Sequence, residues 1–205
     1  MSVLPSGPPW TAPCDDACWN RAAGVMLRSC VLRFLASALG YPTDAAFAAM
    51  RSSLDACLPL SDRMPRRVAS YLSRFAEEIS GWDRQRYESE YLRVFSHVCA
   101  ADCNPHESVF TSKHIFQVTQ RLANIEGSYR AFGLETGKER SDHIAVEFEF
   151  LAFLSYREAV ARLQGQRALA GEMLRGQKVF LERHLGKWVQ PFSLLLERKA
   201  ETGPL

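Results

Sequence analysis

Apolar residues recur at intervals of three and four along most of this chain of 205 residues, which is the period of an α-helix. The first periodic stretch follows Asp15 and Asp16, either of which can cap a helix, and it stops at Gly40, before Pro42. Turn and capping residues divide the pattern that follows, and Gly133 closes the last helix of this part of the chain. Five helices are therefore expected first, at about residues 15–40, 43–58, 61–81, 83–98 and 111–132.

The segment that begins near Asp142 carries two periods at once. From Val146 to Phe150 apolar and acidic residues alternate, as in a strand, but over a longer window the apolar residues recur at helical spacing. No turn residue interrupts the run before Gly165, and this length suits a helix better than a strand. Because apolar residues cover most of its circumference, we expect this helix to lie buried at the centre of the fold. One or two further helices complete the chain, and Pro191 starts or kinks the last.

The whole pattern predicts an all-α fold, a single helical domain of about eight or more helices in two lobes. Residues 133–140 are polar and contain two glycines, so we predict a hinge loop there between an N-terminal lobe at 16–138 and a C-terminal lobe at 139–205. Residues 1–15 include four prolines and are predicted to be a disordered tail. Hinge loops can let lobes exchange between protomers, so we expect a monomer or a hinge-exchanged dimer.

Composition excludes several classes of function without changing the fold prediction. Charged residues make up 23% of the chain, the net charge is +2 and no block of Lys or Arg stands out, so a nucleic-acid partner is not indicated. The N-terminus lacks the basic start and apolar core of a secretory signal. No uninterrupted apolar window approaches the length that spans a bilayer. We therefore expect a cytoplasmic protein with reduced thiols.

Two pairs of cysteines share the spacing Cys-x3-Cys, and His97 lies two residues before the second pair. Thiolates and imidazole at short spacing can bind zinc, but the familiar spacings have two or four intervening residues, and the first pair begins in the predicted tail. We interpret both pairs as ordinary thiols with no assigned role; they are Cys14 with Cys18 and Cys99 with Cys103. Cys30 and Cys57 lie among apolar residues and are expected in the core.

The clearest cluster of ionisable residues lies where the linker meets the central helix. Asp142 stands at the expected helix start, where the macrodipole favours a carboxylate, and His143 and Glu147 share one helix face. From the residues alone, a capping aspartate with a His–Glu hydrogen bond is the preferred interpretation. The alternative is a small metal-dependent hydrolase, although the motif His-Glu-x-x-His is absent. Its ligands would be His143 and Glu147 with some combination of His106, Glu107 and His114.

Three segments carry a resemblance to a known family. Residues 104–110 read Asn-Pro-His-Glu-Ser-Val-Phe, residues 139–150 begin Glu-Arg-Ser-Asp-His, and residues 184–192 fit His-Leu-x-x-Trp-x-x-x-Phe. They resemble, in order, the loop before a core helix, the hinge signature Glu-x-x-Asp-His-x-x-x-Glu and the C-terminal stretch of the TorD/DmsD/NarJ family of redox-enzyme maturation chaperones. The likeness extends over roughly residues 25–196. Ser141 stands where many relatives have proline, so the backbone that enters the second motif is less restricted here.

The resemblance implies a non-enzymatic, system-specific chaperone that needs no cofactor and no metal. Such chaperones bind the leader peptide and the catalytic subunit of an apo-molybdoenzyme in the cytoplasm, and they hold it unexported until the molybdenum cofactor is inserted. By this resemblance Asp142 and His143 match positions implicated in leader binding, and Glu107 and Ser108 lie in the matching loop.

A helical groove with carboxylates at its rim would suit a leader that combines an arginine pair with an apolar stretch. The rim carboxylates expected from the sequence are Asp142, Glu107 and Glu147. His143 would either sense protonation or orient Asp142. A helical regulatory adaptor without a leader-peptide client is a third interpretation.

Overall fold

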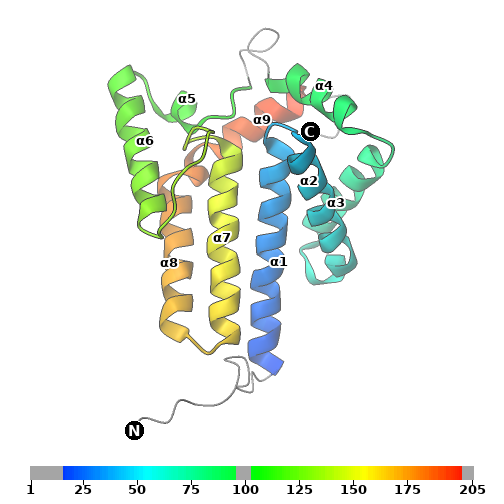
Figure 1. Ribbon diagram of the computed structural model, residues 1–205, viewed down its shortest axis with the longest axis vertical. Coiled ribbons are helices and arrows are strands. Elements are labelled where there is room, and N and C mark those ends of the chain that lie inside the picture. The colour runs from blue at the N-terminus through cyan, green and yellow to red at the C-terminus, as the bar shows by residue number, and fades with distance from the viewer. Residues whose placement is uncertain (1–15, 96–102, 200–205) are drawn as a thin grey trace.

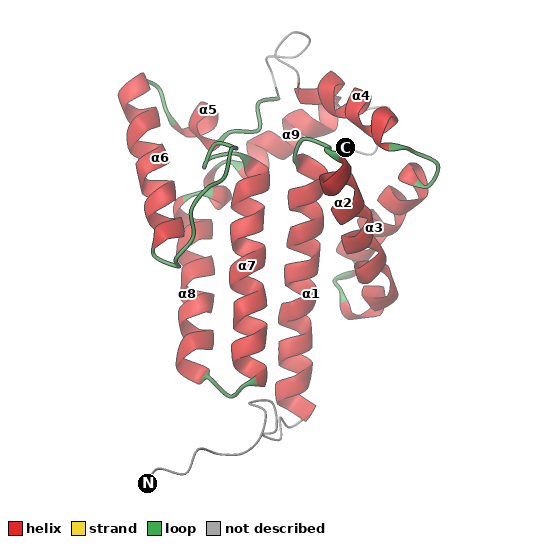
Figure 2. Cartoon of the chain, viewed as in Figure 1, coloured by secondary structure: helices red, strands yellow, loops and turns green. Residues whose placement is uncertain are grey.

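The computed structural model describes residues 16–95 and 103–199, with side chains from residue 19 onward. Within these residues the chain forms helices and loops, apart from one isolated bridge between His106 and His143, so the predicted all-α fold is confirmed. Figures 1 and 2 show the arrangement. The elements are α1 (Asp16–Leu39), α2 (Asp44–Cys57), η1 (Leu58–Arg63), α3 (Arg66–Ile79), α4 (Arg84–Phe95), α5 (Glu107–Thr111), α6 (Ile115–Arg130), α7 (Ile144–Leu163), α8 (Arg167–Arg183), η2 (Leu185–Lys187) and α9 (Val189–Lys199).

Helices α8, α7 and α1 stand side by side and form the middle of the molecule (Figure 1). Of all pairs of described elements, α1 and α7 make the most extensive contact, and α7 and α8 also pack closely. Helix α7 has buried residues on most sides, as the sequence predicted, because apolar positions surround it. The local alternation at 146–150 therefore does not produce a strand.

Two clusters of buried side chains hold the helices together. The first surrounds α7 and includes Leu151, Leu154, Phe180 and Trp188. The second lies between α1, α2 and α3. Because α1 contributes to both clusters and packs along α7, the expected lobes at 16–138 and 139–205 share a large interface. The hinge between them stays a prediction.

A buried carboxylate ties the three central helices to one another. The Glu158 side chain on α7 accepts hydrogen bonds from Arg28 on α1 at 2.7 Å, from Arg162 at 2.6 and 2.8 Å, and from Gln177 on α8 at 2.9 Å. Ser155, one turn earlier, donates to the Gln177 side-chain oxygen at 2.9 Å. A buried charge is tolerated when it is paired in this way, so the network fixes how α1, α7 and α8 meet.

Two helix boundaries differ from the sequence prediction. The helix expected at 111–132 begins later, as α6 at Ile115, and the short α5 forms before it in residues where no helix was expected. The extended backbone of Ser112 separates the two. The helix expected from residue 61 begins at Arg66, because Pro59 opens the separate turn η1 and Pro65 precedes α3 with a non-helical backbone.

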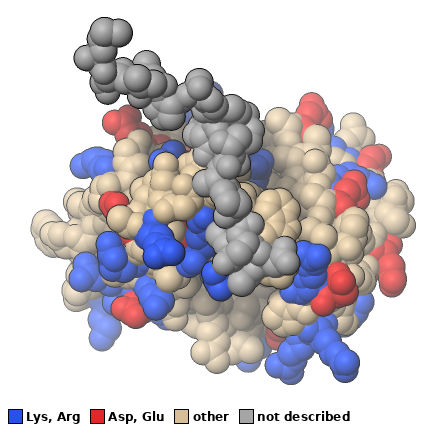
Figure 3. Space-filling view, turned by 90° about the horizontal axis from the view of Figure 1, so that it is seen from below, with Lys and Arg blue, Asp and Glu red and all other residues tan. Residues whose placement is uncertain are grey.

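The apolar stretch Trp19–Leu39 of α1 is long and hydrophobic enough to cross a bilayer, by length and composition only. The expectation that no window approaches this length was therefore wrong at α1. A third of the stretch is buried within the protein, and an apolar core helix meets the same criterion. On the lower end of the molecule, acidic and basic side chains are interspersed with uncharged ones (Figure 3).

Several predictions about the thiols and the tail lie outside the described residues. These concern residues 1–15, Cys14 and Cys99, together with the side chain of Cys18. Cys103 is buried, and burial raises the pKa of its thiol to about 11. Cys57 is buried and Cys30 packs against the same apolar cluster, as expected of core thiols.

Candidate functional site

The loop before α5 and the end of the linker before α7 meet as a short antiparallel pair. The backbone N–H of Glu107 donates to the carbonyl of Asp142 at 2.9 Å, and that of Ile144 donates to the carbonyl of Pro105 at 2.8 Å. The structure thereby brings together Glu107, Ser108, Asp142 and His143, four of the five residues selected from the sequence. Glu147 lies one turn into α7 and also points into this cluster.

Asp142 is fully buried and its carboxylate is satisfied from within the chain. Arg140 donates to it from Nε at 3.1 Å and from Nη2 at 2.9 Å, and the backbone N–H of Ser108 donates to Oδ2 at 3.1 Å. Arg140 Nη2 also donates to the Ser108 hydroxyl at 3.0 Å. The sequence hypothesis placed Asp142 at an exposed rim, but the structure uses it to clasp the linker to the 104–108 loop.

His143 caps α7, a role that the sequence interpretation gave to Asp142. Its Nδ1 accepts a hydrogen bond from the backbone N–H of Ala145 at 3.1 Å. Burial, followed by the neighbouring His106, lowers the pKa of His143 to about 4. The side chain is therefore neutral at pH 7, with its proton on Nε2 because Nδ1 is the acceptor.

His106, Glu139 and His143 form a group whose ligand atoms lie within 4.8 Å of one another, close enough to hold a metal ion. The His106 ring stands edge-on to that of His143 at 5.1 Å between centroids, and its Nδ1 lies 2.8 Å from the Asn104 side-chain oxygen. A metal on His143 would need the Nε2 lone pair, which the capping tautomer does not offer. The described geometry thus favours a capped helix over a metal centre.

Beneath this clasp lies a pair of buried carboxyl groups, Glu107 and Glu147, both fully shielded from solvent. Glu107 accepts from His184 Nδ1 at 3.2 Å and pairs with Arg121 Nε at 3.3 Å. Glu147 Oε2 accepts from the Trp188 indole at 3.2 Å. The expected hydrogen bond between His143 and Glu147 is replaced by these contacts.

Burial, reinforced by the adjacent Glu107, raises the pKa of Glu147 well above its usual range. Its Oε1 has no donor against it, which would leave a buried acceptor unsatisfied. A proton on Glu147 removes the deficit, because the protonated carboxyl group can donate to Glu107. Both side chains are held within this buried layer, and neither is available as an exposed rim charge.

An open groove of about 420 Å³ lies beside the clasp, between the linker and the exposed side of α7. Its floor is apolar and includes Val146, Phe150 and Phe153. Exposed carboxylates line its edges, from Glu135 and Glu139 on the linker and Glu149 on α7, and Lys138 adds one cation. This groove has the apolar floor and acidic rim that the sequence hypothesis required, but different residues supply the carboxylates.

Sequence reasoning missed the partners that make the cluster work. Arg140 was inside the recognised motif, and His184 and Trp188 were inside the third matched segment, yet their contacts with residues far away in the chain could not be read from spacing. The sequence evidence for Arg140, His184 and Trp188 was their position within the matched motifs. Glu139 also stood inside the second matched motif, whereas Arg121 and Glu135 carried no such signal. His114, a ligand in the hydrolase alternative, precedes α6 without capping it through its side chain.

Comparison with known proteins identifies similar chains. Residues 61–193 match the family model described as nitrate reductase delta subunit. The chain is 27% identical over 190 residues to a perchlorate reductase assembly chaperone protein from Dechloromonas aromatica (strain RCB). The alignment covers 85% of this chain and 80% of that protein. A solved structure from Archaeoglobus fulgidus, a proposed redox enzyme maturation protein, aligns with a TM-score of 0.40 and 22% identity over 75% of this chain and 93% of its own.

Proposed function

Because the chain belongs to the nitrate reductase delta subunit family, we propose that it is an assembly chaperone for the catalytic subunit of a molybdenum-dependent reductase. The resemblance inferred from the three motifs is confirmed by this family match. The curated relative from Dechloromonas aromatica, an assembly chaperone for perchlorate reductase, supports the same role. In this proposal the chain is not an enzyme, works in the cytoplasm and acts on the apo-subunit before cofactor insertion and export.

We further propose that the groove between the linker and α7 binds the twin-arginine leader of this client. A leader combines an arginine pair with an apolar stretch, and the groove offers apolar side chains between exposed carboxylates. Guanidinium groups bind carboxylates with paired, charge-assisted hydrogen bonds. The combination of apolar floor and acidic rim is the single observation that carries the proposal.

The residues selected from the sequence act in this proposal by holding the groove in place. Asp142, with Arg140 and Ser108, anchors the end of the linker on which Glu139 stands. His143 fixes the start of α7, whose outer side forms the floor. Glu107 and Glu147 form the buried layer under this anchor. Losing any of them would change the groove without removing a direct contact to the leader.

The test uses a fluorescein-labelled peptide with an arginine pair followed by about ten apolar residues. Replacing Glu135, Glu139 and Glu149 together by glutamine should weaken binding about tenfold, since ion pairs of the two leader arginines at about 0.7 kcal/mol each total about 1.4 kcal/mol. Raising the salt concentration should weaken binding of the wild-type protein as well. Fluorescence anisotropy measures both effects.

The matched control removes the same charge elsewhere, by replacing three exposed carboxylates of α8 and α9 with glutamine: Glu172, Glu182 and Glu197. Its dissociation constant should equal that of the wild type. A peptide with lysine in place of both arginines should bind more weakly, because an ammonium group cannot form the bidentate contact. Equal affinities of the groove variant and the control would refute this location for the leader.

A further inference from the structure

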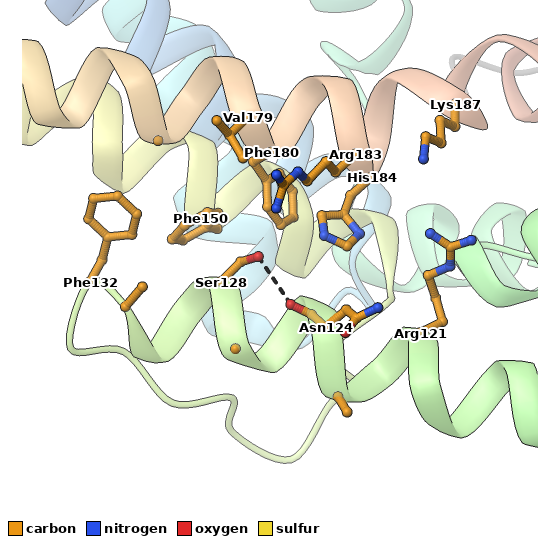
Figure 4. A pocket seen from close by; sticks show the side chains of 14 residues that line it. Arg121, Asn124, Ser128, Phe132, Phe150, Val179, Phe180, Arg183, His184 and Lys187 are labelled. Carbon is orange, nitrogen blue, oxygen red and sulfur yellow. Dashed lines mark hydrogen bonds between the residues drawn. The ribbon is translucent and has the colours of Figure 1, made fainter.

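A second groove lies on the other side of α6, where it faces α8. Its volume is about 630 Å³ and it is open to solvent. Figure 4 shows Arg121 and Lys187 at one end, Arg183 and His184 in the middle, and Phe132 at the other end. This groove takes no part in the leader site proposed above, although Phe150 lies at the back of both.

The charge of this second groove has one sign. Arg121, Arg183 and Lys187 line it, and no aspartate or glutamate is among its described lining residues. Arg183 and Lys187 form no ion pair or hydrogen bond through their side chains within the described part of the chain, and both are exposed. The side chains of Arg183 and Lys187 can therefore bind an external anion. Arg121 lies at one end of the groove and is paired with the buried Glu107.

The floor of this groove is aromatic and its walls leave space. The ring of Phe132 is partly exposed and Val179 is exposed, whereas the rings of Phe150 and Phe180 lie buried beneath them. A Cβ atom added at Gly127 would meet nothing within 4 Å, whereas one added at Gly176 would lie 2.4 Å from the Phe132 ring. The Phe132 ring thus packs against Gly176 and closes one end of the groove. Gly127 has no side chain and leaves space in the wall that α6 forms.

We propose that the groove between α6 and α8 binds an acidic segment of a partner protein, with carboxylates on Arg183 and Lys187 and an apolar side chain against Phe132 and Val179. An elongated groove between two helices is a recurrent way to hold a peptide segment. The charge complementarity and the aromatic floor together specify a segment that mixes Asp or Glu with a large apolar residue.

The ends of the two helices argue against a multiply charged phosphate compound as the ligand. Both α6 and α8 contribute residues from their middle and C-terminal turns to the lining, and among the described residues no α-helix N-terminus lines it; the short 3-10 helix η2 begins there, directly after His184. Helix C-termini carry partial negative charge, whereas phosphate groups bind at helix N-termini. A carboxylate carries a single negative charge and pairs with a long basic side chain, so the negative helix C-termini repel it less than they repel a phosphate group.

The experiment selects peptides from a phage-displayed library of random sequence on the immobilised full-length protein. A counter-selection uses the variant in which Arg183→Glu and Lys187→Glu reverse the charge of the groove. Peptides that survive should be enriched in Asp and Glu next to an apolar residue. A synthetic copy of the leading peptide should lose at least tenfold in affinity for the charge-reversed variant.

Two further variants separate the groove from the general charge of the surface. Gly127→Trp should abolish binding by filling the open space while leaving the circular dichroism spectrum unchanged. Arg175→Glu with Lys178→Glu changes the net charge by the same amount at exposed positions of α8 outside the lining, and it should bind the peptide like the wild type.

Selected peptides without acidic enrichment, or affinities that follow net charge in both charge-reversed variants, would overturn the proposal. Saturable binding of inorganic tripolyphosphate that blocks the peptide would also overturn it in favour of a small phosphate ligand. The leader-peptide assay is independent of these variants, so failure here leaves the proposed leader groove to its own test.

Discussion

Replacing Glu147 by glutamine should change how the stability of the protein depends on pH. The carboxyl group is fully buried and its pKa is raised well above 4.5, chiefly by burial and then by Glu107. Glutamine has nearly the same shape, can accept from the Trp188 indole through its oxygen and can donate to Glu107 through its amide. The substitution therefore removes a titration while keeping the contacts.

The sign follows from proton binding. Below pH 4.5 the carboxyl group of Glu147 is protonated in both the folded and the unfolded chain, and its contribution is fully present. As the pH rises toward the folded-state pKa, the unfolded chain loses this proton while the folded protein keeps it. The free energy of unfolding of the wild type then falls by about 1.4 kcal/mol per pH unit relative to Glu147→Gln.

His143 contributes the opposite slope over a lower range. Its folded-state pKa of about 4 lies below the ordinary value of 6.5, so stability is lost as the pH falls from 6.5 to about 4. The two slopes oppose one another between about pH 4.5 and 6.5. We therefore expect the wild-type profile to be flatter than that of Glu147→Gln over this range, because the variant should gain stability as the pH rises and then level off near pH 6.5.

Urea denaturation followed by circular dichroism at half-unit steps from pH 4.5 to 8 measures the free energy of unfolding of both proteins. The exposed substitution Glu172→Gln serves as the control and should reproduce the wild-type profile. Parallel profiles for the wild type and Glu147→Gln would refute the inference that burial raises the pKa of Glu147 in the folded protein.

Two further predictions concern the supports of the fold and of the leader groove. Glu158→Ala should lower the free energy of unfolding by about 2 kcal/mol. This is less than the roughly 3–5 kcal/mol lost when a fully buried ion pair is broken, because Arg28 and Arg162 are partly exposed and can rehydrate. If chemical denaturation shows a loss no larger than that of Glu158→Gln, the buried Glu158 network does not hold the three helices together. Limited trypsin digestion should cut first within residues 133–140. Asp142→Ala should accelerate that cleavage, because it releases the end of the linker. First cuts inside α7 or α8, or an unchanged cleavage rate in the variant, would exclude the hinge.

Helix content and the central role of α7 could be predicted from the sequence because both depend on local periodicity. Twenty residues of α7 without a turn signal outweigh five residues that alternate like a strand. Boundaries set by a single residue were harder to predict. Ser112 has an extended backbone between α5 and α6, within the polar run from Thr111 to His114, which offered several possible starts for α6.

The residues selected from the sequence lie together in the structure, but their contacts differ from those that the sequence suggested. The motif around Asp142 and His143 and the loop around Glu107 were recognised from the sequence, and the structure places them together. Their burial, however, follows from pairing across 34 residues between Ser108 and Asp142, and across 77 between Glu107 and His184. Spacing along the chain contains no information about such contacts.

The sequence by itself thus determined an all-helical chain, its most buried helix and the two segments that meet at the clasp. Only the tertiary structure decided which carboxylates face solvent. Asp142, Glu107 and Glu147 are withdrawn from water and held by partners, while Glu135, Glu139 and Glu149 stand exposed over an apolar floor. The physical reason is that the charge state of a carboxyl group, and its access to a ligand, depend on the solvent and the neighbours that the fold places around it.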